Sequence, residues 1–183
     1  DLAGVGVMVD SCRVCEACKA SMEPYCAKGM VGTYNARDYA GELMFGGYAN
    51  NIITDERYAF TISPKLNLAA VAPLLCAGIT TYSPLRHWKA GKGKKVGVVG
   101  LGGLGHMGLK FAHSFGAHVV QFTTSESKAA DAKKLGADEV VISKDAGAMA
   151  KQAGTFDFLL ACVSAPPAMP AYLGLLRLNG TLC

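Results

Sequence analysis

The sequence predicts an α/β protein in which a doubly wound parallel sheet follows a mostly β segment. Apolar runs alternate with helical patterns through the second half of the 183-residue chain, which is typical of βαβ units with right-handed crossovers. A glycine-rich motif follows the first of these runs, and short runs broken by Gly, Asn and Pro occupy residues 1–68. With 51% hydrophobic and 17% charged residues, the chain can bury a core.

The first half is expected to form short strands joined by loops, because its apolar runs are brief and bounded by turn-forming residues. The candidate strands are 5–9, 46–48, 51–54 and 58–62. We expect a first domain over residues 1–72 and a second over 73–183.

The Ala- and Leu-rich segment 68–88 is expected to be helical. Pro73 lies near a helix start, where proline is tolerated, and Pro84 marks a kink or an end. Cys76 lies in this segment, and a free cysteine on an apolar helix is usually a small core residue.

Strands and helices alternate beyond Gly91. Strands are expected at 95–100, 118–123, 139–143, 156–161 and from 181 onward. Helices are expected at 104–115, 128–135, 146–152 and 168–176.

Four cysteines lie close together with the spacing Cys12-x2-Cys15-x2-Cys18-x7-Cys26. Four thiolates at this spacing can converge on one tetrahedral zinc ion. The alternative is a pair of local disulfides, which a chain with its own core does not need. The other cysteines are dispersed, as expected for free thiols in a reducing cytosol: Cys76, Cys162 and Cys183.

A G-x-G-x-x-G motif, Gly100-Leu101-Gly102-Gly103-Leu104-Gly105, follows the apolar run 96–99 and precedes a helical pattern. In this context the glycines permit a tight turn and a close approach of the backbone to a pyrophosphate, which the helix N-terminus attracts. The alternative is a glycine-rich turn without a ligand. The motif favours a Rossmann-type dinucleotide site.

The end of the second strand indicates which dinucleotide binds. A carboxylate about 20 residues beyond the motif would bind the ribose hydroxyls of NAD, but the sequence offers Thr123, Thr124, Ser125 and Lys128, with no carboxylate before Glu126. We therefore predict NADP(H), because a carboxylate there would repel its 2′-phosphate. The hydroxyls also suit a helix N-cap, and both roles can coexist.

Charge and hydropathy exclude some partners. The net charge is +4, and its densest cluster, 89–95, lacks interleaved aromatic residues, which argues against nucleic-acid binding. No apolar run reaches the length of about 18 residues that a membrane-spanning helix needs, and no charged-then-apolar leader opens the chain. We expect a soluble, cytoplasmic protein.

The ends of the chain suggest a fragment. It begins at Asp1 rather than Met and stops at Cys183, where a strand is expected to be starting. We expect the first domain to be partial and the second to be incomplete at its C-terminus.

Four motifs occur in order along the chain: the four-cysteine loop, 46–49 (GGYA), 76–85 (CAGITTYSPL) and GLGGLG. Together they resemble the zinc-dependent medium-chain alcohol dehydrogenases. The likeness covers essentially the whole chain and is greatest to the cinnamyl alcohol dehydrogenase branch and its bacterial NADP-dependent aldehyde reductases. It implies that the four cysteines hold a structural zinc in a lobe of a GroES-like catalytic domain. It also makes Cys76 a ligand of a second, catalytic zinc and places Thr80 near the nicotinamide.

The same resemblance assigns the cofactor residues. Those around the pyrophosphate are Gly100, Gly102, Gly103, Leu104 and Gly105; those selecting NADP are Thr123, Thr124, Ser125 and Lys128; those bordering the adenosine half are Val163 and Ser164. The family's other catalytic-zinc ligands, a Cys and a His-Glu pair, have no counterpart in residues 1–11. For the histidines we expect surface or packing roles: His87, His106, His113 and His118.

The activity implied is hydride transfer between NADP(H) and a primary alcohol or aldehyde, chiefly aldehyde reduction, by a full-length homodimer. One alternative is a zinc-independent quinone oxidoreductase of the same superfamily, which would lack the four-cysteine lobe. Another is a non-catalytic zinc-binding module, although no basic face emerges in a loop where Arg13, Lys19 and Lys28 are offset by Glu16 and Glu23.

Overall fold

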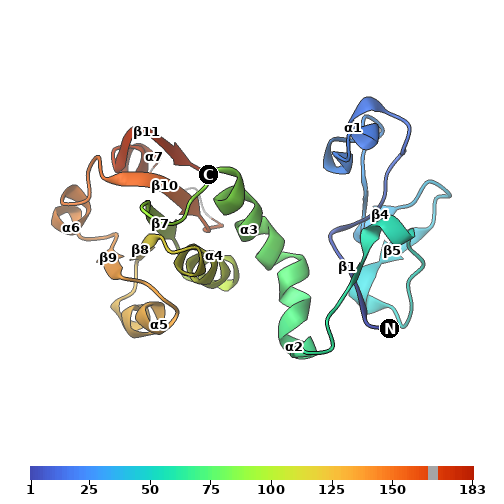
Figure 1. Cartoon of the computed structure of the whole chain (residues 1–183), viewed down its shortest axis with the longest axis horizontal. Helices are drawn as coiled ribbons and strands as arrows, with labels where there is room; N and C mark the ends of the chain where they lie inside the picture. Colours follow the sequence, from blue (N-terminus) through green and yellow to red (C-terminus); the bar gives the residue numbers. More distant parts are fainter. Residues whose placement is uncertain (165–168) are drawn as a thin grey trace. The chain divides into compact units, whose positions relative to one another are not determined.

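The computed structural model describes residues 1–164 and 169–183 and divides into two compact units, Asp1–Cys76 and Ala77–Cys183 (Figure 1). The division lies within the segment where we expected a domain boundary, but after Cys76 rather than after residue 72. The first residue of the helix expected at 168–176 lies outside the described residues.

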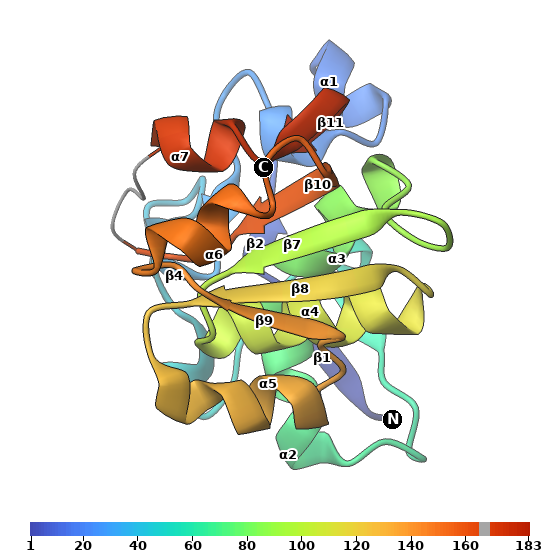
Figure 2. The ribbon, with the colours of Figure 1, turned by 90° about the vertical axis from the view of Figure 1, so that its left-hand side faces the viewer.

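A five-stranded parallel sheet forms the centre of unit Ala77–Cys183. Its strands are β7 (Lys95–Val99), β8 (His118–Thr123), β9 (Glu139–Ile142), β10 (Phe156–Ala161) and β11 (Leu176–Leu182). The spatial order is β11-β10-β7-β8-β9, and Figure 2 shows the strands side by side. The chain therefore builds outward from β7 to β9 and then returns to place β10 on the other side of β7, which confirms the predicted doubly wound fold.

Helices cover both faces of this sheet: α3 (Ala77–His87), α4 (Gly103–Ser114), α5 (Ala129–Lys134), α6 (Ala146–Ala150) and α7 (Met169–Leu173), with the 3-10 helix η5 (Glu126–Lys128) before α5. One apolar cluster joins Leu85 of α3, Leu109 of α4 and Ala132 of α5 to the sheet. A second cluster joins Tyr172 of α7 and Met149 of α6 to the other face. The unit thus buries apolar side chains on both sides of its strands, as a parallel sheet requires.

Two expected boundaries in this unit are wrong. Strand β11 begins at Leu176, which pairs with Phe156, rather than at Thr181. Helix α3 continues past Pro84 to His87, so Pro84 does not end the helix, and a kink at this proline, the other expectation, stays a prediction.

Unit Asp1–Cys76 contains only short antiparallel pairs: β1 (Ala3–Val5) with β6 (Ala59–Thr61), β2 (Met8–Asp10) with β3 (Val31–Gly32), and β4 (Tyr34–Arg37) with β5 (Leu43–Phe45). Brief helical turns connect them: α1 (Glu16–Lys19), η1 (Glu23–Tyr25), η2 (Gly46–Tyr48), η3 (Glu56–Tyr58), α2 (Leu68–Val71) and η4 (Ala72–Leu75). The regular structure of residues 1–67, before α2, is mostly β, as expected.

Three expectations for this unit are wrong in detail. Residues 46–48 form a 3-10 turn rather than a strand, because Gly46 has φ +56° and packs under the Tyr34 ring, where a Cβ would lie 2.5 Å from a ring carbon. Residues 51–54 have no regular structure. The run 5–9 is broken after Val5, so that β1 and β2 pair with different partners.

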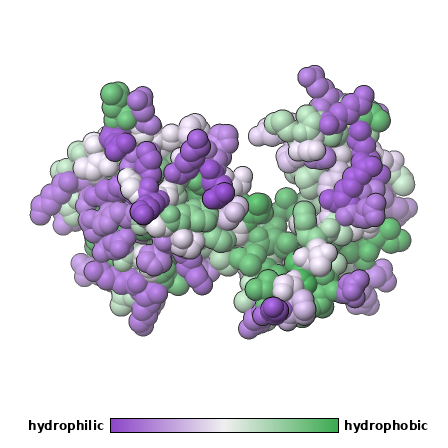
Figure 3. Space-filling view, in the orientation of Figure 1, coloured by the Kyte–Doolittle hydropathy of each residue, from purple (hydrophilic) through white to green (hydrophobic). Residues whose placement is uncertain are grey.

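No single helix within the described ranges is long and apolar enough to cross a membrane, although the bent pair Leu68–Leu75 and Ala77–His87 meets the length and composition requirement when taken together. Figure 3 shows hydrophilic residues over most of the visible surface of unit Ala77–Cys183.

Candidate cofactor cleft and metal centre

A cleft of about 380 Å³ opens at the carboxyl ends of the parallel strands, beside β7 and β10. These neighbours are the strands between which the chain order reverses, and α/β sheets bind ligands at such switch points. The lining residues lie at the ends of strands, in the segments that follow them, or on α7: Val99, Gly100, Leu101, Gly102, Phe122, Thr123, Thr124, Lys128, Ser143, Cys162, Val163, Ser164 and Tyr172.

Two glycines of the motif are required by the fold itself. Gly100 has φ +91°, and a Cβ there would lie 2.6 Å from Val163 Cγ1 and 3.0 Å from the Cys162 carbonyl oxygen. A Cβ on Gly105 would overlap the carbonyl oxygen of Gly100. Both positions exclude a side chain because α4 and the segment after β10 pack directly on the turn.

The other two glycines face open space. Apart from its chain neighbours and the adjacent backbone of α4, no heavy atom of the described chain lies within 4 Å of a Cβ built on Gly102 or Gly103. Gly102 is the N-cap of α4 and provides no side chain to cap it, so the first N–H groups of this helix are available to an anion. The open space and the free N–H donors at the N-terminus of α4 therefore fit a pyrophosphate group.

The other end of the cleft carries hydroxyl groups and one cation. Thr123 Oγ1 accepts a hydrogen bond from the Ser125 N–H (3.3 Å), and Lys128 Nζ donates to the Leu101 carbonyl (3.2 Å). Ser125 occupies the N-cap of η5, but its side chain makes no capping hydrogen bond and instead contacts Ser127 Oγ at 2.7 Å. Lys128 is the only charged side chain among the described lining residues, which suits a phosphate better than a neutral ribose.

The predicted cofactor residues divide into two groups. Seven line the cleft: Gly100, Gly102, Thr123, Thr124, Lys128, Val163 and Ser164. The others do not line it: Gly103, Leu104 and Gly105 lie in the first turn of α4, Ser125 follows Thr124, and Thr80 lies exposed on α3.

The lining residues that sequence reasoning missed include Ser143, Cys162 and Tyr172. Ser143 and Cys162 each follow a strand, and the rule that ligands bind at carboxyl strand ends could have found both. Tyr172 reaches the cleft only because α7 packs on the sheet. Burial raises the pKa of the Cys162 thiol to about 11, so this group is neutral at physiological pH.

The four clustered cysteines meet in space. Their Sγ atoms all lie within 4.8 Å of one another, with Cys15 and Cys18 at 3.4 Å and Cys12 and Cys18 at 3.9 Å. A zinc tetrahedron with Zn–S bonds of about 2.3 Å has S–S edges of about 3.8 Å. All four thiols are free, so the donor set fits a closed zinc site rather than disulfides.

Backbone N–H groups point at these sulfur atoms. Cys12 N–H donates to Cys26 Sγ (3.4 Å), Cys15 N–H to Cys12 Sγ (3.4 Å) and Ala27 N–H to Cys15 Sγ (3.5 Å). The Ala27 and Cys18 N–H groups lower the pKa of Cys15 to about 6, because they stabilise the thiolate. These contacts favour the ionised form of Cys15, which is the form that a metal binds, whereas the pKa of the neighbouring Cys18 thiol is raised.

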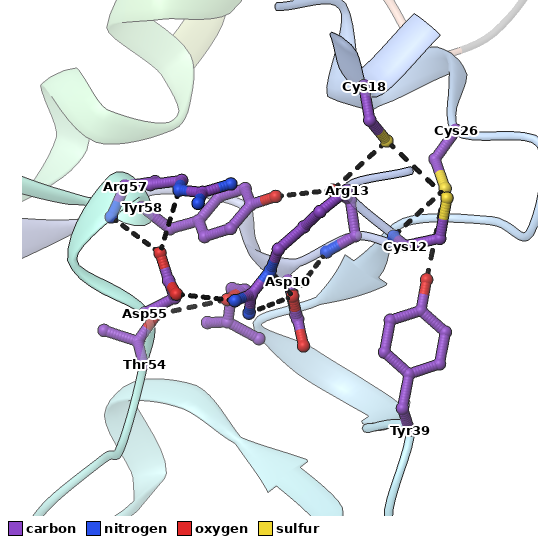
Figure 4. Close-up of polar contacts among 12 residues, drawn as sticks. Asp10, Cys12, Arg13, Cys18, Cys26, Tyr39, Thr54, Asp55, Arg57 and Tyr58 are labelled. Carbon is purple, nitrogen blue, oxygen red and sulfur yellow. Dashed lines mark hydrogen bonds and ion pairs between the residues drawn. The ribbon is translucent and has the colours of Figure 1, made fainter. Parts of the chain in front are cut away.

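Polar side chains connect this lobe to the segment around Asp55 (Figure 4). Arg13 lies between two carboxylates, with guanidinium nitrogens 2.7 Å from Asp10 Oδ1 and 2.8 Å from Asp55 Oδ2. The Tyr58 hydroxyl donates to Ser11 Oγ at 2.7 Å. Two separate contacts thus hold residues 54–58 against the cysteine loop.

The predicted catalytic residues, Cys76 and Thr80, belong to no cluster of possible metal ligands within the described ranges. Cys76 is exposed and interrupts the helical segment between η4 and α3, with φ −128° and ψ −80°, so the expectation that it lies on a helix is wrong. Thr80 is exposed on α3. Within the described ranges, the four lobe cysteines form the only group of three or more side chains placed to share a metal ion.

The histidines lie at other sites. His118 Nε2 is 2.7 Å from Glu139 Oε1, His106 Nδ1 is 3.3 Å from the Gly102 carbonyl oxygen, and His87 packs edge-on against Trp88.

Comparisons with known proteins place this geometry among dehydrogenases. Residues 103–183 match the family described as zinc-binding dehydrogenase. Over its whole length the chain is 58% identical to aldehyde reductase YahK of Escherichia coli (strain K12) and 54% identical to NADP-dependent alcohol dehydrogenase C 1 of Mycolicibacterium smegmatis, covering 52% of each. The chain therefore spans about half the length of these curated relatives.

Solved structures agree with this placement. A cinnamyl alcohol dehydrogenase from Sorghum bicolor superposes with a TM-score of 0.95 at 40% identity, over all of this chain and 52% of that one. The enzyme of this type from Helicobacter pylori, solved in complex with NADP(H), gives 0.91 at 41% identity, over all of this chain and 51% of that one.

Proposed function

We propose that this chain, which belongs to the zinc-binding dehydrogenase family as its sequence predicted, provides the cofactor cleft and the metal lobe of an NADP-dependent alcohol dehydrogenase that reduces aldehydes. The observation that carries the proposal is the cleft at the switch point. There, two unobstructed glycines meet the N-terminus of α4, and hydroxyl groups with one lysine stand where a carboxylate would select NAD.

The residues of the cleft bind and orient the cofactor. The N–H groups at Gly102, Gly103 and the start of α4 bind the pyrophosphate, while Thr124 and Lys128 hold the 2′-phosphate at the end of β8. Val163 and Ser164, after β10, border the adenosine half. NADPH, when bound, supplies the hydride, and the protein supplies its position.

The two predicted metal sites have different roles. The lobe cysteines saturate a tetrahedral ion, so that site supports folding and leaves no position for substrate. Cys76 is exposed and would join ligands from outside this chain around a catalytic zinc, whose contribution when bound is to polarise the substrate carbonyl. Thr80, one helical turn further on in α3, would lie beside the nicotinamide. Homodimerisation and a cytoplasmic location stay predictions for the full-length protein.

Cofactor selectivity tests the cleft. In the full-length enzyme we expect kcat/KM for aldehyde reduction to be much higher with NADPH than with NADH. Lys128→Ala should raise KM for NADPH about 10-fold or more, because a charge-assisted hydrogen bond contributes about 1.5 to 3 kcal/mol, and should leave KM for NADH nearly unchanged. Lys110→Ala, an exposed lysine of α4 outside the cleft lining, is the matched control. Equal efficiency of the wild-type enzyme with both cofactors would contradict the proposal.

Metal counting tests the second assignment. The full-length protein should carry two zinc ions per subunit, and Cys76→Ala should lose one of them together with turnover, while the lobe keeps its ion. Undiminished activity in Cys76→Ala would refute the catalytic role.

A further inference from the structure

Three alternate residues at the start of the cysteine loop and in the strand before it, Val9, Ser11 and Arg13, contact segment 54–58. Thr54 Oγ1 donates to the Val9 carbonyl (3.3 Å), the Tyr58 hydroxyl donates to Ser11 Oγ (2.7 Å), and Arg13 pairs with Asp55 (2.8 Å). Figure 4 shows Arg13 and Tyr58 directed at one another's segments across this junction. The contact between Tyr58 and Ser11 differs from the other two because Ser11 also contacts a cysteine, Cys18.

A buried chain of hydroxyl groups runs from Tyr58 to Cys18. Ser11 Oγ lies 3.3 Å from Cys18 Sγ, and Tyr58, Ser11 and Cys18 are 6%, 2% and 8% exposed. Because the three residues are buried, their polar atoms are expected to be hydrogen-bonded within the protein, and here they contact one another. The Tyr58 hydroxyl occupies one acceptor position of Ser11 and leaves the hydrogen of Ser11 free to point elsewhere.

The state of Cys18 decides where that hydrogen points. A thiol at Cys18 donates to Ser11 Oγ, which is the arrangement seen. A metal ligand must be a thiolate, which has no hydrogen to donate. The hydroxyl of Ser11 can then turn and donate to the sulfur, because Tyr58 still supplies a donor to its oxygen.

We propose that Ser11 is an outer-sphere residue of the metal lobe that donates a hydrogen bond to the Cys18 thiolate, and that Tyr58 is the positioning residue that orients Ser11 for this role. This inference rests on the proposed function to the extent that the lobe holds zinc. Groups around metal ligands orient them and tune their charge, and their removal typically reduces metal affinity about 10- to 100-fold. The segment around Tyr58, remote in sequence from every lobe cysteine, thus controls how firmly the lobe retains its ion.

The test measures metal loss at the lobe itself. The zinc-loaded full-length protein is treated with EDTA and iodoacetamide, and alkylation of Cys12, Cys15, Cys18 and Cys26 is followed by peptide mass spectrometry, which separates them from Cys76. Ser11→Ala and Tyr58→Phe should speed alkylation about 10-fold or more. Tyr25→Phe, in the same lobe but 72% exposed, should leave the rate unchanged.

A double variant separates the proposed chain of contacts from general loosening. Because Tyr58 acts through Ser11, Tyr58→Phe should add nothing to the rate in a Ser11→Ala background. Arg13→Gln breaks a neighbouring connection to the same segment and should accelerate alkylation much less than Tyr58→Phe. In cobalt(II)-substituted protein, Ser11→Ala should shift the thiolate-to-metal charge-transfer band to lower energy, since the sulfur regains electron density.

The outcomes are distinguishable. Wild-type rates in both single variants, additive effects in the double variant, or equal effects of Arg13→Gln and Tyr58→Phe would each overturn the inference. If Ser11→Ala fails to fold, Tyr58→Phe, which keeps the ring, decides the question. Wild-type lobe cysteines that react at one rate with and without EDTA would instead contradict the proposed zinc lobe.

Discussion

The two units of this chain are stabilised by different kinds of interaction. In unit Ala77–Cys183 two apolar clusters pack on the faces of a five-stranded sheet, and both clusters consist of residues from this unit. In unit Asp1–Cys76 the strands form two-stranded pairs, which are marginal in water on their own. Burial of apolar surface stabilises unit Ala77–Cys183, whereas contacts of sulfur and charged groups stabilise unit Asp1–Cys76.

The comparison predicts that metal removal acts on one unit and spares the other. Chelation of zinc, or Cys15→Ser, should abolish amide protection around residues 11–29, because a binding free energy of about 10 kcal/mol or more supports folding at structural zinc sites. Strands β7 and β8 should keep their protection. Hydrogen exchange read by mass spectrometry checks this, with Cys183→Ser, an exposed cysteine, as the control.

Loss of protection throughout both units would show that the metal stabilises the whole chain, and the contrast between the units would then be wrong.

The glycine loop offers the next largest effect. Gly105→Ala should destabilise unit Ala77–Cys183 by about 3 kcal/mol or more, because overpacking against backbone cannot be relieved by a rotamer change. Gly102→Ala, which meets no neighbour within 4 Å, should unfold at nearly the wild-type denaturant concentration but bind NADPH at least about 10-fold more weakly. Denaturant titration and NADPH fluorescence measure the two effects. Similar stability of the two variants would contradict the distinction between fold-required and ligand-facing glycines.

A third prediction concerns acid stability of the same unit. Asp157 accepts from the Lys95 N–H (2.9 Å), Lys94 Nζ (3.2 Å) and Arg177 (2.7 Å) with its side chain 9% exposed. Burial alone would raise the pKa of Asp157, but these partners outweigh it and hold the pKa below its ordinary value. Its stabilisation is therefore complete above the unfolded pKa of about 3.9 and is lost as pH falls through the lower folded value.

Asp157→Asn should thus reduce the unfolding free energy by about 1 to 3 kcal/mol at pH 7, and the difference from wild type should vanish in acid. Urea titrations at several pH values test this. Asp131→Asn, which breaks an exposed pair with Lys134 at 3.7 Å, should change little. A difference that persists unchanged at pH 2 to 3 would show that the carboxylate charge is not responsible.

The smallest effect is expected at Arg13. The ion pairs of this residue with Asp10 and Asp55 are partly exposed, so Arg13→Gln should reduce local stability of unit Asp1–Cys76 by about 1 kcal/mol or less, and less still at high salt. Hydrogen exchange in residues 54–58 at two salt concentrations measures it. A larger, salt-independent loss would mean that Arg13 acts through packing.

The sequence predicted the strands of unit Ala77–Cys183 better than those of unit Asp1–Cys76. Strands β8 and β10 have the predicted bounds, because buried parallel strands are continuous apolar runs that local sequence reveals. Strands β3, β4 and β5 were missed because they are short and carry no alternation strong enough to identify, and β4 and β5 are also largely exposed. Their pairing depends on neighbours such as the Tyr34 ring over Gly46.

For the candidate site, the motif spacing alone predicted both the dinucleotide loop and the cysteine cluster, because each requires particular residue types at short intervals. The sequence by itself also determined the alternation of strands and helices and the absence of a carboxylate between the end of β8 and Glu126. Only the tertiary structure decided which glycines are constrained by backbone contact, which residues of α7 and of the segment after β9 reach the cleft, and that Ser11 and Tyr58 form a chain of hydrogen bonds to Cys18. The physical reason is the distance along the chain between the residues that interact. A motif of a few neighbouring residues can be recognised in the sequence, whereas contacts between segments 40 or more residues apart, such as that of Ser11 with Tyr58, form only when the chain folds.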